Sequence, residues 1–177
     1  MNTAHGSLDP SAWVARWAPL VTAGPVLDVA SGAGRHSKLF RQRGFEVTAV
    51  DRDTQALPEG ITFVKADLED GSPWPFAGQH FGAIVVTNYL HRPLLPLLAG
   101  ALQEGGVLIY ETFMVGNERF GKPSNPNFLL RPGELLQAFG SLTVVAFEQG
   151  TVERPKRAAL QRICVIRGNA EGVRISA

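Results

Sequence analysis

The sequence predicts an α/β fold, a doubly wound sheet of seven strands that is mostly parallel and has one antiparallel strand in a C-terminal hairpin. The first observation is a series of five short apolar runs that alternate with helical patterns or turns. Such runs are typical of parallel strands that are covered on both faces. The second observation is that the last two apolar runs, 142–147 and 160–166, are joined by a linker without a helical pattern. We therefore expect these two strands to form a hairpin.

The composition is that of an ordinary globular protein. The chain has 177 residues, a net charge of +1 and 45% hydrophobic residues, so we expect a single domain over residues 1–177. Its single cysteine excludes an internal disulfide and a cysteine-rich metal site, and we expect no metal. No apolar run approaches the length of a membrane helix, and no signal peptide is visible, so we expect a cytoplasmic protein that does not contact membranes.

In the first half of the chain, a leading helix is followed by strands and helices in alternation. Asp9 is expected to cap the leading helix, with Pro10 at its first position. Trp13 and Trp17 share one face of that helix, which predicts core packing, with a lid over a ligand as the alternative. We expect a weak helix or a turn over 53–60. The other expected elements are strands at 26–29, 46–50, 61–66 and 81–87 and a helix at 35–43.

The second half is predicted to hold two helices, a strand, a long connection and the hairpin. The helices are expected over 94–103 and 131–139, with the fifth strand over 107–111 between them. The connection 114–127 is long for a compact domain and rich in Gly, Asn, Lys and Pro, and such segments are usually functional or mobile. We interpret it as a lid over a binding site, with a floppy insertion as the alternative.

Small and acidic residues at successive strand ends predict a nucleotide-like ligand. The first strand contains Asp28 and runs into a turn with Gly32 and Gly34, where the backbone can approach a ligand closely. Asp51 ends the second strand, a position where an acid usually binds both ribose hydroxyls. Asn88 ends the fourth strand, at the edge where open parallel sheets place their ligands.

These motifs, in this order, resemble those of the class I S-adenosylmethionine-dependent methyltransferases. The resemblance covers about residues 10–167 and rests on five segments and on the final hairpin. The segments are 26–34, Val50-Asp51, 66–68, 81–88 and 105–109. Segment 129–135 makes the chain most similar to the small-molecule branch that includes tellurite-resistance-type enzymes. Alanine replaces the first of the family's usual three turn glycines, at Ala30.

The resemblance implies a Rossmann-like fold, S-adenosyl-L-methionine as the cofactor, and a small-molecule acceptor. It implies that Asp67 meets the adenine amino group and that Leu68 lines the adenine pocket. The residues expected to bind the cofactor are Asp28, Ala30, Gly32, Gly34, His36, Asp51, Arg52, Asp67, Leu68 and Asn88.

Three residues near the fourth and fifth strand ends are candidates for catalysis: Tyr89, His91 and Glu111. The sulfonium methyl group is already activated, so the protein mainly aligns the reactants, and a base is needed only for a protonated acceptor. His91 has a suitable reference pKa. Strand alternation lets only one of Tyr110 and Glu111 face a given side. Expected substrate contacts are Arg92, Asn117, Arg119 and Lys122.

The sequence is also compatible with three other functions. A basic C-terminal region, 151–177, favours RNA or protein methylation, although the small net charge of the whole chain argues against nucleic acid. A cofactor-binding scaffold without activity is the second function, and a nicotinamide-dependent oxidoreductase is the third. We expect a monomer or a weak homodimer.

Overall fold

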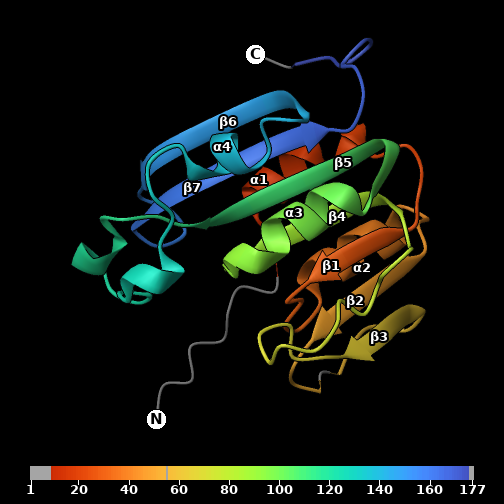
Figure 1. Cartoon of the computed structure of the whole chain (residues 1–177), viewed down its shortest axis with the longest axis horizontal. Helices are drawn as coiled ribbons and strands as arrows, with labels where there is room; N and C mark the ends of the chain where they lie inside the picture. The colour runs from red at the N-terminus through yellow and green to blue at the C-terminus, as the bar shows by residue number, and fades with distance from the viewer. Residues whose placement is uncertain (1–8, 55, 176–177) are drawn as a thin grey trace.

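The protein is described by a computed structural model over residues 9–54 and 56–175. One sheet of seven strands runs through the molecule in the order β3-β2-β1-β4-β5-β7-β6 (Figure 1). Strand β7 is antiparallel to both β5 and β6, and the other neighbouring strands are parallel. The predicted fold class and the antiparallel hairpin strand are therefore confirmed. The strands are β1 (Val26–Val29), β2 (Val47–Asp51), β3 (Ile61–Lys65), β4 (Phe81–Thr87), β5 (Leu102–Phe113), β6 (Thr143–Val152) and β7 (Ala158–Ile166).

Helices cover both faces of the sheet, and each face has its own hydrophobic cluster beneath its helices. Helices α1 (Ala12–Trp17) and α2 (Arg35–Gln42) pack on one face, where Trp13, Trp17 and Phe40 are buried. Helices α3 (Leu95–Gly100) and α4 (Glu134–Ala138) pack on the other. The two tryptophans meet edge to face with ring centroids 5.7 Å apart, so they are core residues and not a lid. The short 3₁₀ helices are η1 (Ala18–Leu20), η2 (Arg92–Leu94), η3 (Asn117–Arg119) and η4 (Pro126–Phe128).

The cap of α1 differs from the prediction. Ser11, not Asp9, is the N-cap, because its hydroxyl accepts hydrogen bonds from the backbone N–H groups of Trp13 (3.1 Å) and Val14 (3.4 Å). The helix therefore begins at Ala12, two residues beyond the expected proline position. The helix or turn expected over 53–60 is a turn in the described part of that segment.

The helix predicted over 94–103 is wrong at its C-terminal end. Helix α3 stops at Gly100, and Leu102 already belongs to β5, where it pairs with Phe81. The backbone N–H of Phe81 donates to the carbonyl of Ala101 at 2.8 Å. The chain after Ala101 is therefore extended and pairs with the start of β4. The segment with Gly105-Gly106 is therefore an irregularity inside β5 and not a turn before it. A Cβ atom at position 106 would lie 2.8 Å from the carbonyl oxygen of Phe81.

Candidate functional site

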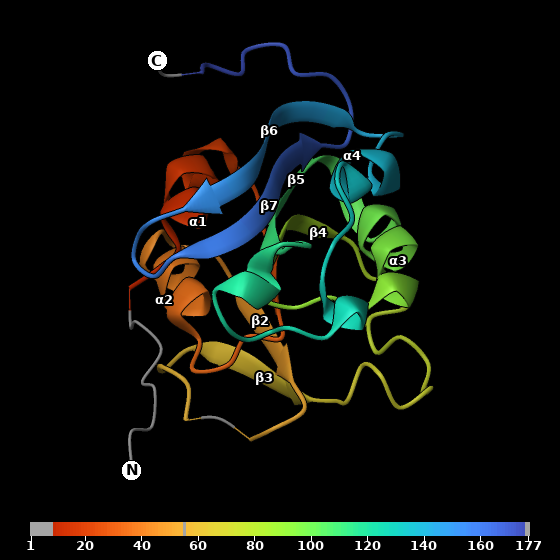
Figure 2. The same ribbon diagram turned by 90° about the vertical axis from the view of Figure 1, so that its left-hand side faces the viewer.

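The carboxyl ends of the parallel strands enclose a cleft of about 430 Å³. Its walls are the turn after β1 and the segments that end or follow β2, β3, β4 and β5. Pro123 and Phe128 form its outer rim. Figure 2 shows the segment after β5, with its short helices, passing in front of these strand ends. The predicted site residues that line the cleft are Ala30, Asp51, Arg52, Asp67, Leu68, Asn88 and Tyr89.

The turn after β1 brings the backbone to the cleft through left-handed conformations. Ala30, Gly32 and Gly34 have φ angles of 51°, 52° and 74°. A Cβ atom at position 34 would lie only 2.6 Å from Cδ2 of Leu57, whereas one at position 32 would meet nothing within 4 Å. The left-handed φ favours glycine at position 34, where a side chain would also displace Leu57, and Gly32 leaves open space beside the backbone. Neither glycine lines the cleft, although both are predicted to bind the cofactor.

Asp51 holds its carboxylate in a fixed orientation at the tip of β2. The N–H of Gly32 donates to Oδ2 at 2.8 Å, and the N–H of Asp53 donates to Oδ1 at 3.0 Å. Because a carboxylate oxygen has a second lone pair, both oxygens still offer an acceptor position to a ligand. One carboxylate therefore connects the β1 turn to the end of β2 and lines the cleft.

The β3 end contributes Asp67, Leu68 and Glu69 to the same cleft. Asp67 accepts a hydrogen bond from the N–H of Glu69 at 2.9 Å, which fixes the turn. Burial and the nearby carboxylate of Glu69 raise the pKa of Tyr89 above its ordinary value. Tyr89 is a predicted catalytic residue, and this environment keeps its phenol protonated on the β3 side of the cleft.

Asp28 and His36 were expected to bind the cofactor, but neither side chain lines the cleft. The buried carboxylate of Asp28 accepts hydrogen bonds from the N–H (2.9 Å) and hydroxyl (2.6 Å) of Ser37. Burial raises the pKa of Asp28 to about 7, although the bonds from Ser37 lower it. The carboxylate thereby connects β1 to the first turn of α2.

The imidazole of His36 is also buried and belongs to the contact between two helices. Its Nε2 accepts a hydrogen bond from the backbone N–H of Ser11 at 3.0 Å. Burial, with a smaller effect of Arg35, lowers the pKa of His36 to about 3. The cofactor-binding role expected for His36 is corrected to a structural one, since the start of α1 occupies its acceptor nitrogen.

Glu111 is not a free base. As strand alternation predicts, it points to the α1 side of the sheet, while Tyr110 points to the other side and donates to the carbonyl of Tyr89 at 2.7 Å. Oε1 of Glu111 accepts a bond from the hydroxyl of Ser11 at 2.7 Å, and Oε2 lies 3.0 Å from the guanidinium of Arg162. These contacts hold the carboxylate on the α1 side of the sheet, and Glu111 is absent from the cleft lining, so the structure does not bring it together with the other predicted site residues.

Arg92 is a clamp and not a substrate contact. Its guanidinium pairs with both oxygens of Glu134, at 2.6 and 3.0 Å, and donates to the carbonyls of Asn127 (2.9 Å) and Leu129 (3.0 Å). The bonds to the two carbonyls tie η2 to the end of the long connection and the residues just after it, and the bonds to Glu134 tie η2 to α4. Because the donors face inward to these partners, Arg92 is absent from the cleft lining.

Asn117 anchors the other end of the connection and is likewise corrected from a substrate contact. It is 2% exposed. Its amide donates to the carbonyl of Pro123 at 3.0 Å and accepts from the N–H of Ala159 at 3.1 Å. The connection is thus held at both ends, so it is not a floppy insertion, and its role as a lid stays a prediction.

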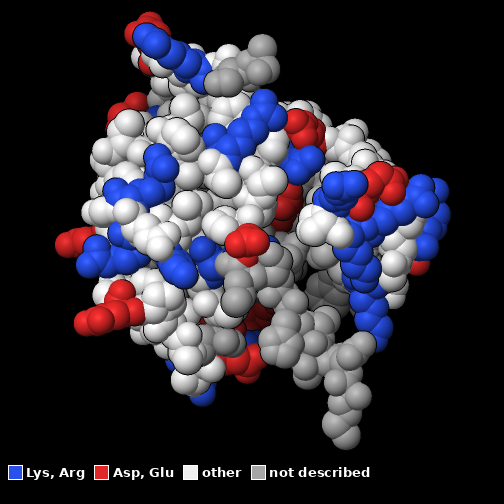
Figure 3. Space-filling model, turned by 180° about the vertical axis from the view of Figure 1, so that it is seen from behind, with Lys and Arg blue, Asp and Glu red and all other residues white. Residues whose placement is uncertain are grey.

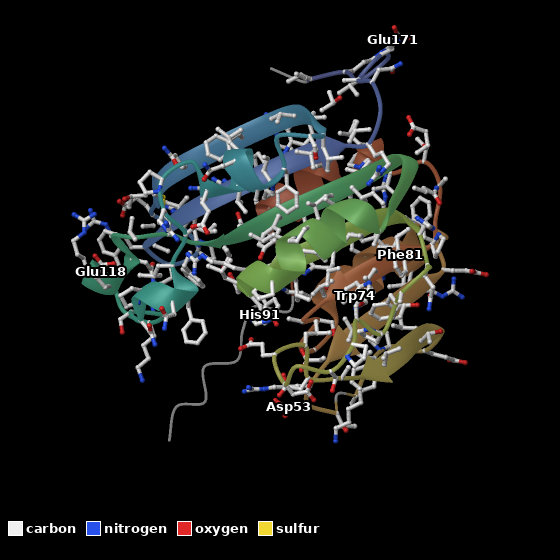
Figure 4. The ribbon with its side chains drawn as sticks, in the orientation of Figure 1. Asp53, Trp74, Phe81, His91, Glu118 and Glu171 are labelled. Atoms are coloured by element: carbon white, nitrogen blue, oxygen red, sulfur yellow. The ribbon has the colours of Figure 1, made fainter. Side chains whose placement is uncertain are left out.

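The remaining candidates lie outside the cleft. His91 and Trp74 line a second hollow of about 750 Å³ on the α3 side of the molecule (Figure 4). This hollow adjoins the cleft, because both are lined by Arg52, Ala66, Asp67, Leu68 and Glu69. Arg119 is exposed, donates to the carbonyl of Gly116 at 3.2 Å and lies over the ring of Phe120. Lys122 is exposed.

Some residues that line the cleft are absent from the predicted site, among them Glu69, Thr112, Phe113, Pro123 and Phe128. Glu69 stands in the acidic run 67–70, next to two predicted residues. Thr112 and Phe113 lie in the last positions of β5, beyond the predicted end of that strand. Extending the strand by two residues would have found them. Pro123 lies within the predicted lid 114–127, and Phe128 directly follows that segment.

Within the described residues, no group of three or more His, Cys, Asp or Glu side chains could hold a metal ion. In the same part of the chain, no helix combines the length and the apolar character that crossing a membrane requires.

Comparisons with known proteins agree with this geometry. Residues 27–109 match the family described as "Methyltransferase domain". TehB from Haemophilus influenzae superposes with a TM-score of 0.72 at 16% identity, over 90% of this chain and 63% of that one, so this chain spans less than two thirds of TehB. The glycopeptide N-methyltransferase MtfA, solved with S-adenosyl-L-methionine, gives a TM-score of 0.59 at 18% identity, over 95% of this chain and 100% of that chain. A methyltransferase from Methanosarcina mazei gives 0.65 at 14% identity, over 90% of this chain and 98% of the other.

Proposed function

We propose that this chain is a class I methyltransferase that transfers the methyl group of S-adenosylmethionine to a small-molecule acceptor in the cleft. The match of residues 27–109 to a methyltransferase family and the strand order β3-β2-β1-β4-β5-β7-β6 support this proposal. The observation that carries the proposal is the placement of Asp51. Its carboxylate is fixed at the tip of β2 by Gly32 and Asp53 and borders the cleft next to the open space at Gly32.

The residues present fit such a cofactor. Asp51 would accept hydrogen bonds from the ribose hydroxyls, and Asp67 with Leu68 would border the adenine. The backbone of the turn, from Ala30 to Gly34, would lie against the amino-acid end, because Gly32 has no side chain and a Cβ atom there would face open space. Binding roles for these residues, and for Arg52 and Asn88 beside them, stay part of the proposal.

When bound, the cofactor supplies a methyl group on a sulfonium, which needs no further activation. The protein then has to align the acceptor and exclude water. Phe113, Pro123 and Phe128 supply apolar surface between the end of β5 and the long connection. Arg92 and Asn117 hold that connection in place, so they act on the acceptor end of the cleft through the position of its wall.

A small acceptor suits the dimensions of this site. The cleft measures about 430 Å³, the adjoining hollow of about 750 Å³ lies at its β3 end, and Pro123 of the connection lines the cleft. The net charge of +1 supplies no overall attraction for a polyanion.

Isothermal titration calorimetry with S-adenosylhomocysteine tests the proposal directly. We expect one binding site per chain, and loss of most of the affinity in Asp51→Ala. Exposed Asp53→Ala is the matched control, since only its backbone N–H contacts Asp51. Absence of binding to the wild-type protein would contradict the proposed function.

One observation favours a second candidate, RNA methylation. Two arginines, Arg119 and Arg157, lie over the ring of Phe120, at 5.3 and 4.8 Å from its centroid. Lys and Arg side chains gather at this end of the molecule, where the β6–β7 turn lies (Figure 3). A gel-shift titration with bulk RNA at moderate salt separates the two candidates, because RNA methylation requires a salt-dependent complex. A single domain, a cytoplasmic location and a monomer or weak homodimer stay predictions.

A further inference from the structure

We propose that the acceptor is an apolar, otherwise uncharged thiol that reacts as its thiolate, without a base from the protein. This inference rests on the proposed function, because it names the acceptor class for the same cleft. It is based on the positions of the titratable side chains at the carboxyl edge of the sheet. It is also based on the uncharged residues that line the cleft at the end of β5.

The side chains that could serve as a base beside β4 and β5 are engaged elsewhere. Glu111 uses one carboxylate oxygen for Ser11 and the other for Arg162. It lies on the α1 face of the sheet and is absent from the cleft lining. His91 and Trp74 line a hollow that adjoins the cleft at its β3 end, where the two share Arg52, Asp67 and Glu69, and that hollow does not include the residues at the end of β5.

The titratable groups that do line the cleft lie toward its other end. Asp51 and Arg52 end β2, and Asp67 and Glu69 follow β3. In the order β3-β2-β1-β4-β5, two strands separate the tip of β2 from the tip of β5. Tyr89 belongs to the acidic end too, since its phenol is influenced by Glu69, Asp67 and Arg52.

The acceptor end is left with uncharged groups in the described part of the chain. Asn88 and Thr112 are its polar residues, and Phe113, Pro123 and Phe128 are its apolar ones. Such a surface favours an apolar body with few polar contacts.

The charges in the rest of the cleft oppose a second negative charge on the acceptor, in addition to the thiolate that would face the positive sulfonium of the cofactor. Among the residues that the structure describes, Asp51, Asp67 and Glu69 are the carboxylates of the lining and Arg52 is its single cation. The guanidinium of Arg52 already pairs with Asp53. An additional carboxylate or phosphate on the acceptor would therefore be repelled.

A thiol fits a site that offers no base. Thiols ionise with pKa values of about 8.5, compared with about 10 for phenols, so a larger fraction is already anionic at neutral pH. The thiol proton leaves to solvent before the reaction. The thiolate sulfur then forms a bond to the methyl carbon as the bond from that carbon to the sulfonium breaks, with the electron pair staying on the cofactor sulfur. Both products, the thioether and S-adenosylhomocysteine, leave the reacting sulfur atoms uncharged.

The first experiment compares matched acceptors with the same ring: benzenethiol, phenol and 4-mercaptobenzoate. S-adenosylhomocysteine release is measured from pH 5 to 9. We expect kcat/KM for benzenethiol to exceed that for each of the other two by about tenfold or more. Phenol lacks the lower pKa of a thiol, and 4-mercaptobenzoate carries an additional negative charge. Ring substituents that shift the thiol pKa should shift the inflection of the pH profile by the same amount.

The second experiment measures binding without turnover. Methyl phenyl sulfide, the thioether product, is titrated by calorimetry into protein saturated with S-adenosylhomocysteine, with benzoate as the charged comparison. Phe128→Ala should weaken binding of the sulfide roughly tenfold, because the lost aromatic surface is of the size of a buried apolar side chain. Leu136→Ala is the control, since Leu136 is an exposed apolar residue that does not line the cleft.

The outcomes separate this inference from the proposed function. Methylation of phenol at the rate of benzenethiol overturns the inference, because a base from the protein must then act. A pH profile whose inflection does not shift with the thiol pKa overturns it for the same reason. Binding of S-adenosylhomocysteine without methylation of any thiol also overturns it and leaves the proposed function standing. If S-adenosylhomocysteine does not bind, the proposed function itself is wrong.

Discussion

Two groups of polar residues lie near the same edge of the sheet and have opposite surroundings. In the half built from β1, β2 and β3, Asp51 and Asp67 accept hydrogen bonds from backbone N–H groups of the turns at this edge and border the cleft. In the half built from β5 and β7, Glu111 and Asn117 bond to distant partners and are buried. A polar residue after a strand is therefore available to a ligand only where no other element of the fold reaches it.

The largest effect expected from this comparison is on stability. Arg92→Ala should lower the free energy of unfolding by about 3 kcal/mol, because it leaves the carboxylate of Glu134 without its cation. The affinity for S-adenosylhomocysteine should stay unchanged. Urea unfolding and calorimetry provide the two measurements.

Arg52→Ala is the matched control for the effect of Arg92→Ala on the free energy of unfolding. Arg52 pairs with Asp53 at 3.5 Å, and the two side chains are 71% and 72% exposed, so its loss should cost less than about 0.5 kcal/mol of stability. Equal destabilisation by the two arginine substitutions would break the comparison.

The second effect is on binding. Asp51→Ala should weaken the binding of S-adenosylhomocysteine by about 2 kcal/mol, or roughly thirtyfold, since hydrogen bonds to a charged acceptor are lost. Asp51→Asn, which keeps one acceptor oxygen, should fall between the variant and the wild type. Unchanged affinity in Asp51→Ala would remove Asp51 from the proposed site.

The third effect concerns pH and the two buried groups beside the turn. Folded His36 stays neutral down to a pKa of about 3, while its unfolded form protonates below 6.5, so its contribution to stability is lost as the pH falls through that window. Folded Asp28 keeps its proton up to a pKa of about 7, while its unfolded form releases it above 3.8, so its contribution is lost as the pH rises.

These two contributions oppose each other between about pH 4 and pH 6.5. His36→Gln should make the unfolding free energy fall with rising pH there, and Asp28→Asn should make it rise, each by up to about 1.4 kcal/mol per pH unit. Urea titrations at several pH values measure the slopes. Slopes of the same sign in both variants would be inconsistent with these assignments.

The smallest effect sharpens the comparison at the exposed end of the connection. Arg119→Ala and Lys122→Ala should each change stability and cofactor affinity by less than about 0.5 kcal/mol, because both side chains are exposed. Thermal unfolding and calorimetry give the two values. A tenfold loss of cofactor affinity in either variant would show that the connection contacts the cofactor.

The sequence was sufficient for the fold because its signals are local. Strand β4 lies where its apolar run predicts, over Phe81–Thr87, and β1 where Val26–Val29 does. The turn with Gly32 and Gly34 and the acids at 51 and 67 were also found from short patterns, and the structure brings them together at one edge. Boundaries failed where pairing decided them, as at Leu102, whose strand character depends on Phe81.

The site was predicted less well because partners lie far away in sequence. Glu111 meets Ser11 across 100 positions, and Arg92 meets Glu134 across 42. Each of these residues has the type and place of a catalytic or substrate-binding group, and only the tertiary structure shows that it is already bonded. Phe128 is the opposite case. It lines the cleft, but an exposed aromatic residue after a loop has no local sequence pattern that indicates a binding role.

The cap at Ser11 has a consequence for biosynthesis. The six residues of α1 are too few for a stable isolated helix, and the cap residue bonds to His36 and to Glu111. On the ribosome, the first of these partners emerges early and the second only after most of the chain has been translated. The N-terminal helix should therefore reach its final place late, when β5 has joined the sheet.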